Sequence, residues 1–465
     1  MKQTSLGLLG ALLIPAGALL ACGAEPPSGI PAFGNDRSET NGVPNPGSSE
    51  NSGSPVVMGG PAATNQESNP ALTLTPAGSA GSTANPPDTS GSGDTTNPTD
   101  TTDPTGTTDP TGTTDPVIPG ASEPTDCGIP APAANIPIGY GAATTGGGTA
   151  TPVEVSSFAE AQAALDAYRD AFKDGDQNAL VLRYTGSFDY STINDVCVQH
   201  TLDAQILEIK QMDNVTFLGA PGSSGNFGIH INRAHNVIVR NMTLGLLPGG
   251  DSSDAITVEG NGTNGDVENV WIDHNELFSS TKDDCDGAGD TEFDGLIDIK
   301  KGARRITISY NYLHDHQKTG LIGFSDSDDT ERYVTFHHNR YENVVSRTPL
   351  QRFGLIHLFN NYYGRITGSG INVRMGGIAL IESNFFENAA NPITSRFSDV
   401  AGFWELRNNH VGPGITWTTE SDTLANADDW QNTATFPAGE LDYAYRPDRA
   451  GCVKQIVLAQ AGAKL

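Results

Sequence analysis

Positive charge is scarce in this sequence. Its 465 residues include 26 lysines and arginines against 55 aspartates and glutamates, so the formal net charge is −29. Proteins that bind nucleic acid or anionic lipid headgroups present basic surfaces to them. The charge balance therefore argues against nucleic acid as a partner and against electrostatic attachment to a membrane surface.

A long apolar run is also missing. The longest, from Leu6 to Ala21, follows Lys2 and is too short to span a bilayer comfortably. It ends in LLAC at Cys22, which resembles a bacterial lipoprotein signal with residues 1–21 as the signal peptide and Cys22 as the lipidated residue. The alternative is an ordinary secretion signal with an incidental cysteine. Both predict export, with the protein lipid-anchored at the bacterial cell envelope or secreted, and with membrane contact only through the anchor.

Cysteines number only five, and no two of them form a CxxC pair, which excludes a zinc ribbon. Without Cys22, four remain. In an exported protein an even number favours disulfides, and four cysteines allow three pairings. The four are Cys127, Cys197, Cys285 and Cys452.

Apolar residues are sparse over residues 22–126. This segment consists largely of Pro, Gly, Ser, Thr, Asn and acidic residues and contains TTDPTGTTDPTGTTDP. Its apolar surface is too small to offset the loss of chain entropy on folding, so we predict a disordered linker. The composition then becomes that of a globular protein, which predicts one folded domain over residues 127–465.

Helical periodicity is almost absent from that domain. Only residues 153–172 show it, and there Ser157 and Glu160 are spaced as in a capping box. The remainder alternates as strands do. Six strand-like segments carry an asparagine at the same place, at intervals of 36, 28, 22, 23 and 25 residues. These are Asn275, Asn311, Asn339, Asn361, Asn384 and Asn409.

A near-constant period of strand–turn units is typical of a solenoid, and asparagines stacked at a tight bend can hydrogen-bond along the stack. We therefore predict an all-β fold, a parallel β-helix with about three short strands per coil and an N-terminal capping helix. The alternative is a β-sandwich, whose turns would recur every 8 to 12 residues or so without an asparagine register.

Three apparent motifs do not support the chemistry they suggest. GNGTNG (260–265) is followed by a strand-like segment rather than a helix, contrary to a dinucleotide site. The acidic loop 282–293 lacks the end residues of an EF-hand loop. His314 and His316 flank an aspartate at the end of a strand-like segment, where neighbouring side chains face opposite sides, so packing and hydrogen bonding are favoured over a metal site.

The segment RTPLQRFG (347–354) contains two arginines five positions apart. In a regular strand Arg347 and Arg352 would point to opposite faces. Pro349 between them marks an edge or a bend, and a bend would turn both toward one side. Four other charged residues are candidates for the same site, although each alone also fits a solvated charge or a strand end. They are Asp254, Asp294, Asp298 and Lys318.

Several ordered motifs within about residues 140 to 410 resemble a known family. They are WIDH (271–274), DGLIDIKKGA (294–303), SYNYLHDHQKTGLIG (309–323), RTPLQRFG and GSGINVRMGG (368–377). Together they resemble the polysaccharide lyase family that contains the bacterial pectate lyases. The resemblance implies a right-handed parallel β-helix and calcium-dependent cleavage of polygalacturonate (pectate) by β-elimination, giving 4,5-unsaturated oligogalacturonides. We also expect a monomer.

The resemblance implies a calcium site. Asp254, Asp294 and Asp298 match the calcium-binding acids of the family. Some members carry a further acid where this chain has Ser252, which implies that calcium is held less tightly here. Four residues of straight strand span about 13 Å, too far for two carboxylates to share one ion, so we expect the backbone to bend between Asp294 and Asp298, at Gly295.

The resemblance also implies three catalytic residues, Lys318, Arg347 and Arg352. Arg347 is the expected base that takes the proton from C5 of galacturonate. Lys318 and Arg352 are expected to bind the substrate carboxylate and the charge that develops beside it. For the cysteines, the resemblance implies that Cys197 pairs with Cys285, which leaves Cys127 and Cys452 to form the other disulfide.

Other functions predict different residues. A pectin lyase that acts on methylated polymer dispenses with calcium, so the three aspartates count against it. A hydrolase on this fold requires a carboxylic acid–base pair flanking the bond. A non-catalytic, sugar-binding β-helix lipoprotein would have lost some of the catalytic residues, and none is missing.

Overall fold

The computed structural model describes residues 117–119, 124, 126–129, 136–250, 253–282, 285 and 293–465. The signal segment 1–21, Cys22, most of the linker and Ser252 lie outside the described residues. The described residues all belong to one compact unit, Thr102–Leu465. Within them, no helix is long and apolar enough to cross a membrane.

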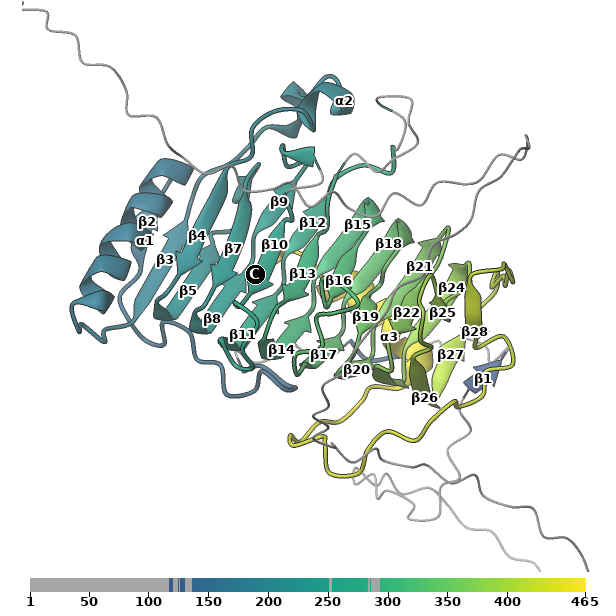
Figure 1. Cartoon of the computed structure of the whole chain (residues 1–465). Coiled ribbons are helices and arrows are strands. Elements are labelled where there is room, and N and C mark those ends of the chain that lie inside the picture. The colour runs from purple at the N-terminus through teal and green to yellow at the C-terminus, as the bar shows by residue number, and fades with distance from the viewer. Residues whose placement is uncertain are drawn as a thin grey trace, which may run out of the picture. The chain divides into compact units, whose positions relative to one another are not determined.

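Three sheets run side by side along this unit (Figure 1), and successive strands of the chain pass from one sheet to the next. For example, β11 (Val267–Asp273), β12 (Glu276–Phe278) and β13 (Ile297–Lys300) each belong to a different sheet, and β14 (Ala303–Ser309) returns to the first. Apart from the antiparallel end strand of one sheet, each strand pairs in parallel with the equivalent strand one coil away. The chain is therefore a parallel β-helix with three strands per coil, as predicted.

We call the three sheets I, II and III. Sheet I contains β6 (Ser224–Gly225), β9 (Thr243–Gly245), β12, β15 (Tyr312–Lys318), β18 (Arg340–Ser346), β21 (Tyr362–Ile366), β24 (Phe385–Ala389), β27 (Asn409–Val411) and β1 (Val117–Pro119). Sheet II contains β4 (Ile206–Lys210), β7 (Gly228–Asn232), β10 (Ile256–Glu259), β13, β16 (Gly320–Ile322), β19 (Leu350–Arg352), β22 (Ile371–Arg374), β25 (Ile393–Arg396) and an antiparallel end strand, β28 (Thr423–Asn426). Sheet III contains β2 (Val153–Val155), β3 (Leu180–Tyr184), β5 (Asp213–Gly219), β8 (His235–Arg240), β11, β14, β17 (Tyr333–His337), β20 (Leu355–Phe359), β23 (Ile378–Glu382) and β26 (Phe403–Arg407).

The predicted asparagine stack lies at the corner between sheets III and I, and we call it the asparagine ladder. Each Nδ2 donates to Oδ1 of the next asparagine at 3.0 to 3.1 Å, and every member is buried. The residue before each asparagine has a positive φ, between 51° and 56°, which turns the chain sharply at that point. The ladder therefore satisfies the buried amide groups at this corner. Its members are Asn275, Asn311, Asn339, Asn361, Asn384 and Asn409.

Apolar side chains fill the interior between the sheets. Inward-facing residues alternate with outward-facing ones along each strand, as in β13, where Ile297 and Ile299 are buried in the core. Aromatic rings of sheet I also stack from coil to coil. Tyr341, Tyr363 and Phe386 have ring centroids 5.1 and 4.7 Å apart. In the apolar core, as at the asparagine corner, equivalent side chains of successive coils therefore contact each other along the axis.

Helix α1 (Phe158–Lys173) closes the N-terminal end of the solenoid (Figure 1) and buries Ala161 and Leu165. The predicted helix over 153–172 was wrong at its start, because Val153–Val155 forms β2 and pairs with β3. Ser157 is the N-cap, and its Oγ accepts from the backbone N–H of Glu160 at 3.2 Å. The Glu160 carboxylate returns to Ser156 instead of Ser157, so the capping box is displaced by one residue.

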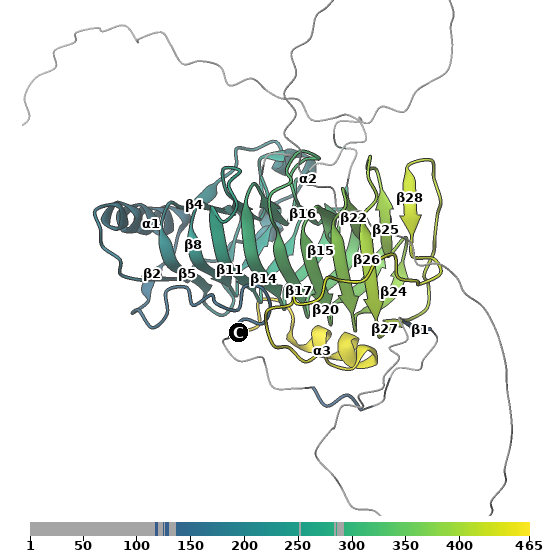
Figure 2. The same ribbon diagram turned by 60° about the horizontal axis from the view of Figure 1, so that its bottom comes forward.

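Two other helices were not predicted. Helix α2 (Val196–Gln199) carries Cys197, and helix α3 (Val453–Gln460) lies along the solenoid in Figure 2. Val453 and Val457 of α3 are buried against Tyr362 and Phe385 of sheet I. This helix covers an apolar patch on the outside of the sheet that would otherwise face water.

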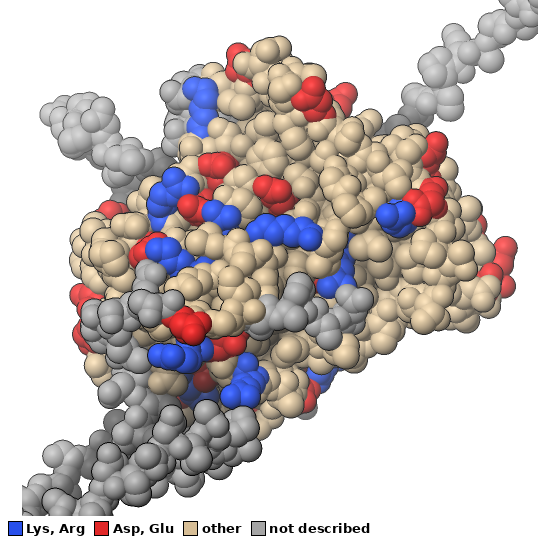
Figure 3. Space-filling view, turned by 180° about the vertical axis from the view of Figure 1, so that it is seen from behind, with Lys and Arg blue, Asp and Glu red and all other residues tan. Residues whose placement is uncertain are grey.

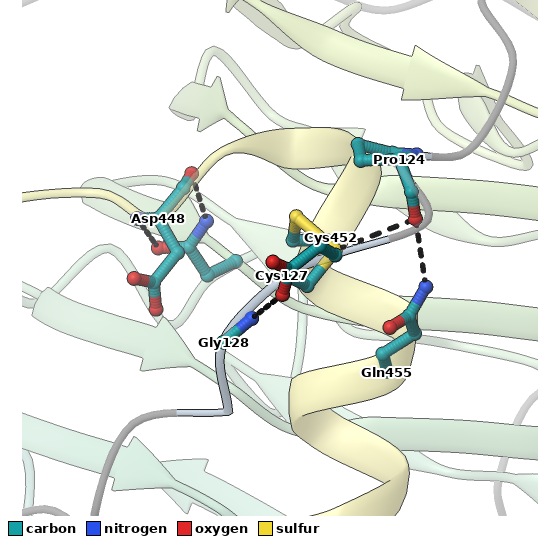
Figure 4. The surroundings of a disulfide bond; sticks show 8 residues. Pro124, Cys127, Gly128, Asp448, Cys452 and Gln455 are labelled. Carbon is teal, nitrogen blue, oxygen red and sulfur yellow. Dashed lines mark hydrogen bonds between the residues drawn. A yellow bond between two sulfur atoms is a disulfide. The ribbon is translucent and has the colours of Figure 1, made fainter.

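Both expected disulfides are present, Cys197 to Cys285 and Cys127 to Cys452. Figure 4 shows the second, which joins Cys127 to the residue just before α3; in α3 itself, Gln455 Nε2 donates to the carbonyl of Pro124 at 3.1 Å. The boundary predicted at residue 127 is too late. Strand β1 lies in the segment interpreted as linker and pairs with β27.

Candidate functional site

The six candidate site residues gather around sheet II and its corner with sheet I. Asp254 lies two residues before the start of β10, and Asp298 lies in the neighbouring strand β13. Lys318 ends β15, and Arg352 ends β19. Asp294 and Arg347 lie outside regular strands, in the segments that lead into β13 and β19. Four coils of the solenoid thus bring together residues that are up to about a hundred positions apart in the chain.

We call Asp254, Asp294 and Asp298 the carboxylate cluster. A lysine that the sequence analysis did not single out, Lys300, lies between two of its members. The Lys300 Nζ is 2.8 Å from Asp254 Oδ2 and 2.9 Å from Asp298 Oδ2. Lys300 belongs to the quoted motif DGLIDIKKGA, but the sequence does not show which carboxylates it meets.

Gly295 makes room for this cluster. Its backbone N–H donates to Asp254 Oδ1 at 2.9 Å. A Cβ at this position would lie 2.4 Å from Asp298 Oδ1 and 2.8 Å from Asp254 Oδ1, closer than atoms can approach. The expected departure from a straight strand is confirmed, because β13 begins only at Ile297. The bend itself lies at Leu296, one residue after the predicted glycine.

The cluster carries more negative charge than Lys300 neutralises. Burial, together with the charges of Asp254 and Asp298, raises the pKa of Asp294 above its ordinary value. Burial and the charge of Asp254 likewise raise the pKa of Asp298. Asp298 Oδ1 is buried and accepts no hydrogen bond from any described residue. In the described part of the chain, no three His, Cys, Asp or Glu side chains converge as a ready metal site. Carboxylate oxygens with unbalanced charge nevertheless suit a hard cation.

Arg347 lies at the corner where the chain passes from β18 to β19. It has a φ of 64°, and a cis peptide bond joins Thr348 to Pro349 just after it. Burial lowers the pKa of the Arg347 guanidinium, the nearby Asp298 opposes this, and Arg352 lowers it further. The Arg347 side chain forms no ion pair with any described residue. That both arginines of RTPLQRFG point toward one side stays a prediction.

Arg352 is already engaged by the protein itself. Its Nε is 2.6 Å from Asp326 Oδ1, and its Nη1 donates to the carbonyl of Gly323 at 3.1 Å. In the sheet it pairs with Arg374, which the sequence analysis quoted only within GSGINVRMGG. Burial and the charges of Arg352 and Arg347 lower the pKa of Arg374 to about 9. Figure 3 shows one face of this acidic protein on which lysines and arginines lie interspersed with acidic side chains.

Lys318 lies two residues after the pair His314 and His316, for which the sequence favours packing and hydrogen bonding over a metal site. His316 is buried, and its Nε2 is 3.1 Å from the carbonyl of Lys318. Burial lowers the pKa of His316 to about 4, so the ring is neutral at ordinary pH. His314 stacks on the ring of Tyr312 at 4.0 Å between centroids. Both histidines therefore pack and hydrogen-bond, as predicted, and His316 helps to fix the backbone that presents Lys318.

The chain is similar to proteins of one family over nearly all of its folded part. The family model described as pectate lyase matches residues 129–465. Pectate lyase B of Dickeya chrysanthemi is 46% identical over 299 residues, covering 61% of this chain and 77% of that protein. Pectate lyase 2 of Pectobacterium atrosepticum is 44% identical over 355 residues, covering 72% of this chain and 91% of that protein.

Solved structures give the same result. Pectate lyase II from Xanthomonas campestris is 52% identical, with a TM-score of 0.66 over 70% of this chain and 98% of that one. Pectate lyase C from Erwinia chrysanthemi is 42% identical, with a TM-score of 0.63 over 71% of this chain and 96% of that one. The chain therefore belongs to the pectate lyase family of enzymes, which cleave pectate by lyase action.

Proposed function

We propose that this enzyme cleaves polygalacturonate by calcium-dependent β-elimination, with Arg347 as the base. One observation carries the proposal. The Arg347 guanidinium forms no ion pair with a described residue, although the charges of all three acids of the carboxylate cluster act on its pKa. A related enzyme, pectate lyase C, has been solved with Ca²⁺, and a mutant of it in complex with pentagalacturonic acid.

The carboxylate cluster is the proposed calcium site. Asp254, Asp294 and Asp298 offer the hard oxygen ligands that calcium prefers, and one of those oxygens, Asp298 Oδ1, has no partner among the described residues. When bound, calcium supplies positive charge that neutralises the substrate carboxylate and stabilises the charge that develops beside it. Arg347 would therefore take the proton beside the carboxylate cluster, where calcium would balance the negative charge that develops on the substrate.

In the proposed reaction Arg347 accepts the proton from C5 of a galacturonate unit. The electrons of the C5–H bond form the C4=C5 double bond, the bond from C4 to the glycosidic oxygen breaks, and that oxygen takes up a proton from solvent. Lys318 and Arg352 hold the substrate carboxylate, and Arg352 exchanges Asp326 for it. Because burial lowers the pKa of Arg347, the unprotonated base becomes more abundant as the pH rises, and activity should increase toward alkaline pH.

Ultraviolet absorbance tests the proposal directly. Polygalacturonate is incubated with the enzyme in calcium and in excess chelator, because elimination creates a conjugated double bond and hydrolysis does not. We expect absorbance to rise only with calcium. A parallel sample of methylated pectin separates the remaining alternative, since a faster, chelator-resistant rise on that polymer would identify a pectin lyase. Reducing ends without ultraviolet absorbance would identify a hydrolase.

We also propose that the protein is exported and that Cys22 carries lipid. The two disulfides support an oxidising compartment. Growth of an expressing bacterium with radiolabelled palmitate should label the wild-type chain and not the Cys22→Ala variant. Equal labelling of both would contradict the anchor, and an unlabelled but exported wild-type chain would identify the ordinary secretion signal.

A further inference from the structure

Lys300 occupies the position of a counter-ion inside the carboxylate cluster. Its side chain is mostly buried, with 18% of its surface exposed, and its ammonium bridges Asp254 and Asp298. It lies two residues after Asp298 on β13, so both side chains point outward from the same strand. Asp254 reaches the same ammonium from the neighbouring coil. Two of the three acids proposed to hold calcium thus already share one cation of the protein, which balances half of their combined charge.

We propose that Lys300 and calcium compete for Asp254 and Asp298, so that Lys300 sets a low affinity for calcium and holds the site together in its absence. The inference rests on the proposed calcium site. It follows from charge and geometry, because a divalent ion that binds Asp254 Oδ2 and Asp298 Oδ2 must share or displace the ammonium that now contacts both oxygens. Lys300 then acts as a positioning residue that lowers calcium affinity.

The next residue in the chain provides a matched control. Lys301 pairs with Glu259 at 2.7 Å and has 41% of its side chain exposed. It carries the same charge but contacts neither Asp254 nor Asp298. If only the total charge of the protein affects calcium affinity, variants of Lys300 and Lys301 should change that affinity equally. If Lys300 competes with calcium for the carboxylate cluster, only the Lys300 variants should change it.

Calcium binding without substrate tests the competition. Titration calorimetry should give Lys300→Met and Lys300→Gln a calcium dissociation constant about tenfold lower than that of the wild type, and Lys301→Met should stay within about twofold. In chelator, Lys300→Met should unfold at a lower temperature than the wild type, because the acids then repel each other without a cation. Saturating calcium should raise its unfolding temperature by more than it raises that of the wild type.

Labelling of the wild-type enzyme provides a second readout that needs no variant. Mass spectrometry after brief acetylation should show Lys300 protected in chelator and labelled several-fold faster at saturating calcium, with Lys301 unchanged. Equal labelling of Lys300 with and without calcium, or calcium affinity in folded Lys300→Gln no higher than in the wild type, would overturn the inference. These failures are distinct from failure of the proposed function, which would appear as a wild-type enzyme that binds no calcium or that cleaves equally well in chelator.

Discussion

The asparagine ladder and the candidate active site occupy different corners of the same solenoid. Polar groups are fully hydrogen-bonded in the ladder, whereas the candidate active site contains like charges and a carboxylate oxygen with no partner among the described residues. In the ladder, Asn361 illustrates full satisfaction. Its Nδ2 donates to Phe336 O and Asn384 Oδ1, and its Oδ1 accepts from the N–H and Nδ2 of Asn339. At the other corner, like charges lie together, and Asp298 Oδ1 is buried without a partner in the described part of the chain.

This difference separates what stabilises the fold from what the site requires. A satisfied buried network rigidifies a structure, while unbalanced buried charge costs stability and is retained where a ligand will balance it. Calcium and a polyanionic substrate would supply the missing charges at the active-site corner. The coils that carry the candidate site residues, from β10 to β19, are each stacked on another coil, and three of these coils also contain a ladder asparagine.

The largest effect is expected from Arg347→Lys, which acts on the charged corner alone. Lysine keeps the positive charge but moves the nitrogen away from the C5 proton, so kcat should fall by roughly 10²–10⁴-fold. KM and the unfolding temperature should change little. Steady-state kinetics at saturating calcium, with thermal unfolding as the control, test this. Turnover near that of the wild type would remove Arg347 from proton abstraction, and Lys318 would be the next candidate.

The ladder is broken by Asn361→Ala. Removing four hydrogen bonds and leaving buried partners unsatisfied should lower the free energy of unfolding by about 3 kcal/mol. Activity per folded molecule should persist, because the ladder lies away from the charged groups. Asn409→Ala at the end of the ladder should cost less, since Asn409 has no further rung beyond it. Denaturant unfolding measures both, and an equal loss would show that position along the ladder does not matter.

The pH dependence of stability separates the two corners without a mutation. The raised pKa values of Asp294 and Asp298 mean that the folded state binds more protons than the unfolded state above about pH 4. In chelator, stability should therefore fall by roughly 1–3 kcal/mol as the pH rises from about 4 through neutrality. Calcium should reduce that slope. An Asp294→Asn variant with an unchanged slope would show that another group is responsible.

How far the sequence predicts the structure differs between the corners. The ladder could be predicted, because asparagines at regular intervals indicate the length of each coil and the hydrogen bonds between the asparagines of successive coils. Helix α3 could not, because VKQIVLAQ is only eight residues long and has no N-cap side-chain hydrogen bond. Strand β1 was missed because its proline-containing sequence does not alternate, and an end strand tolerates proline.

At the active site, the sequence indicated which charges gather but not how they pair. The family resemblance named Asp254, Asp298 and Arg352. The structure places Asp254 and Asp298 in neighbouring coils and Arg352 two coils further along. Lys300 and Lys301 are adjacent in one motif, yet one meets two site acids and the other meets Glu259. Such partners depend on the register between coils and on where a long side chain folds back, neither of which a single sequence records.

Asp326→Ala should give the smallest effect, and it tests whether Asp326 competes with the substrate carboxylate for Arg352. Asp326 holds Arg352 as a substrate carboxylate would, but it lies on an exposed loop with 44% of its side chain in solvent, where an ion pair contributes little. Removing it frees the guanidinium before substrate arrives, so KM should fall about two- to fivefold with kcat unchanged. Asp329→Ala is the matched control, since Asp329 is exposed on the same loop and makes the same change in total charge without contacting Arg352. Steady-state kinetics at low ionic strength should separate the two variants. If both lower KM equally, Asp326 acts only through long-range repulsion of the polyanion, and Arg352 has no internal competitor to exchange.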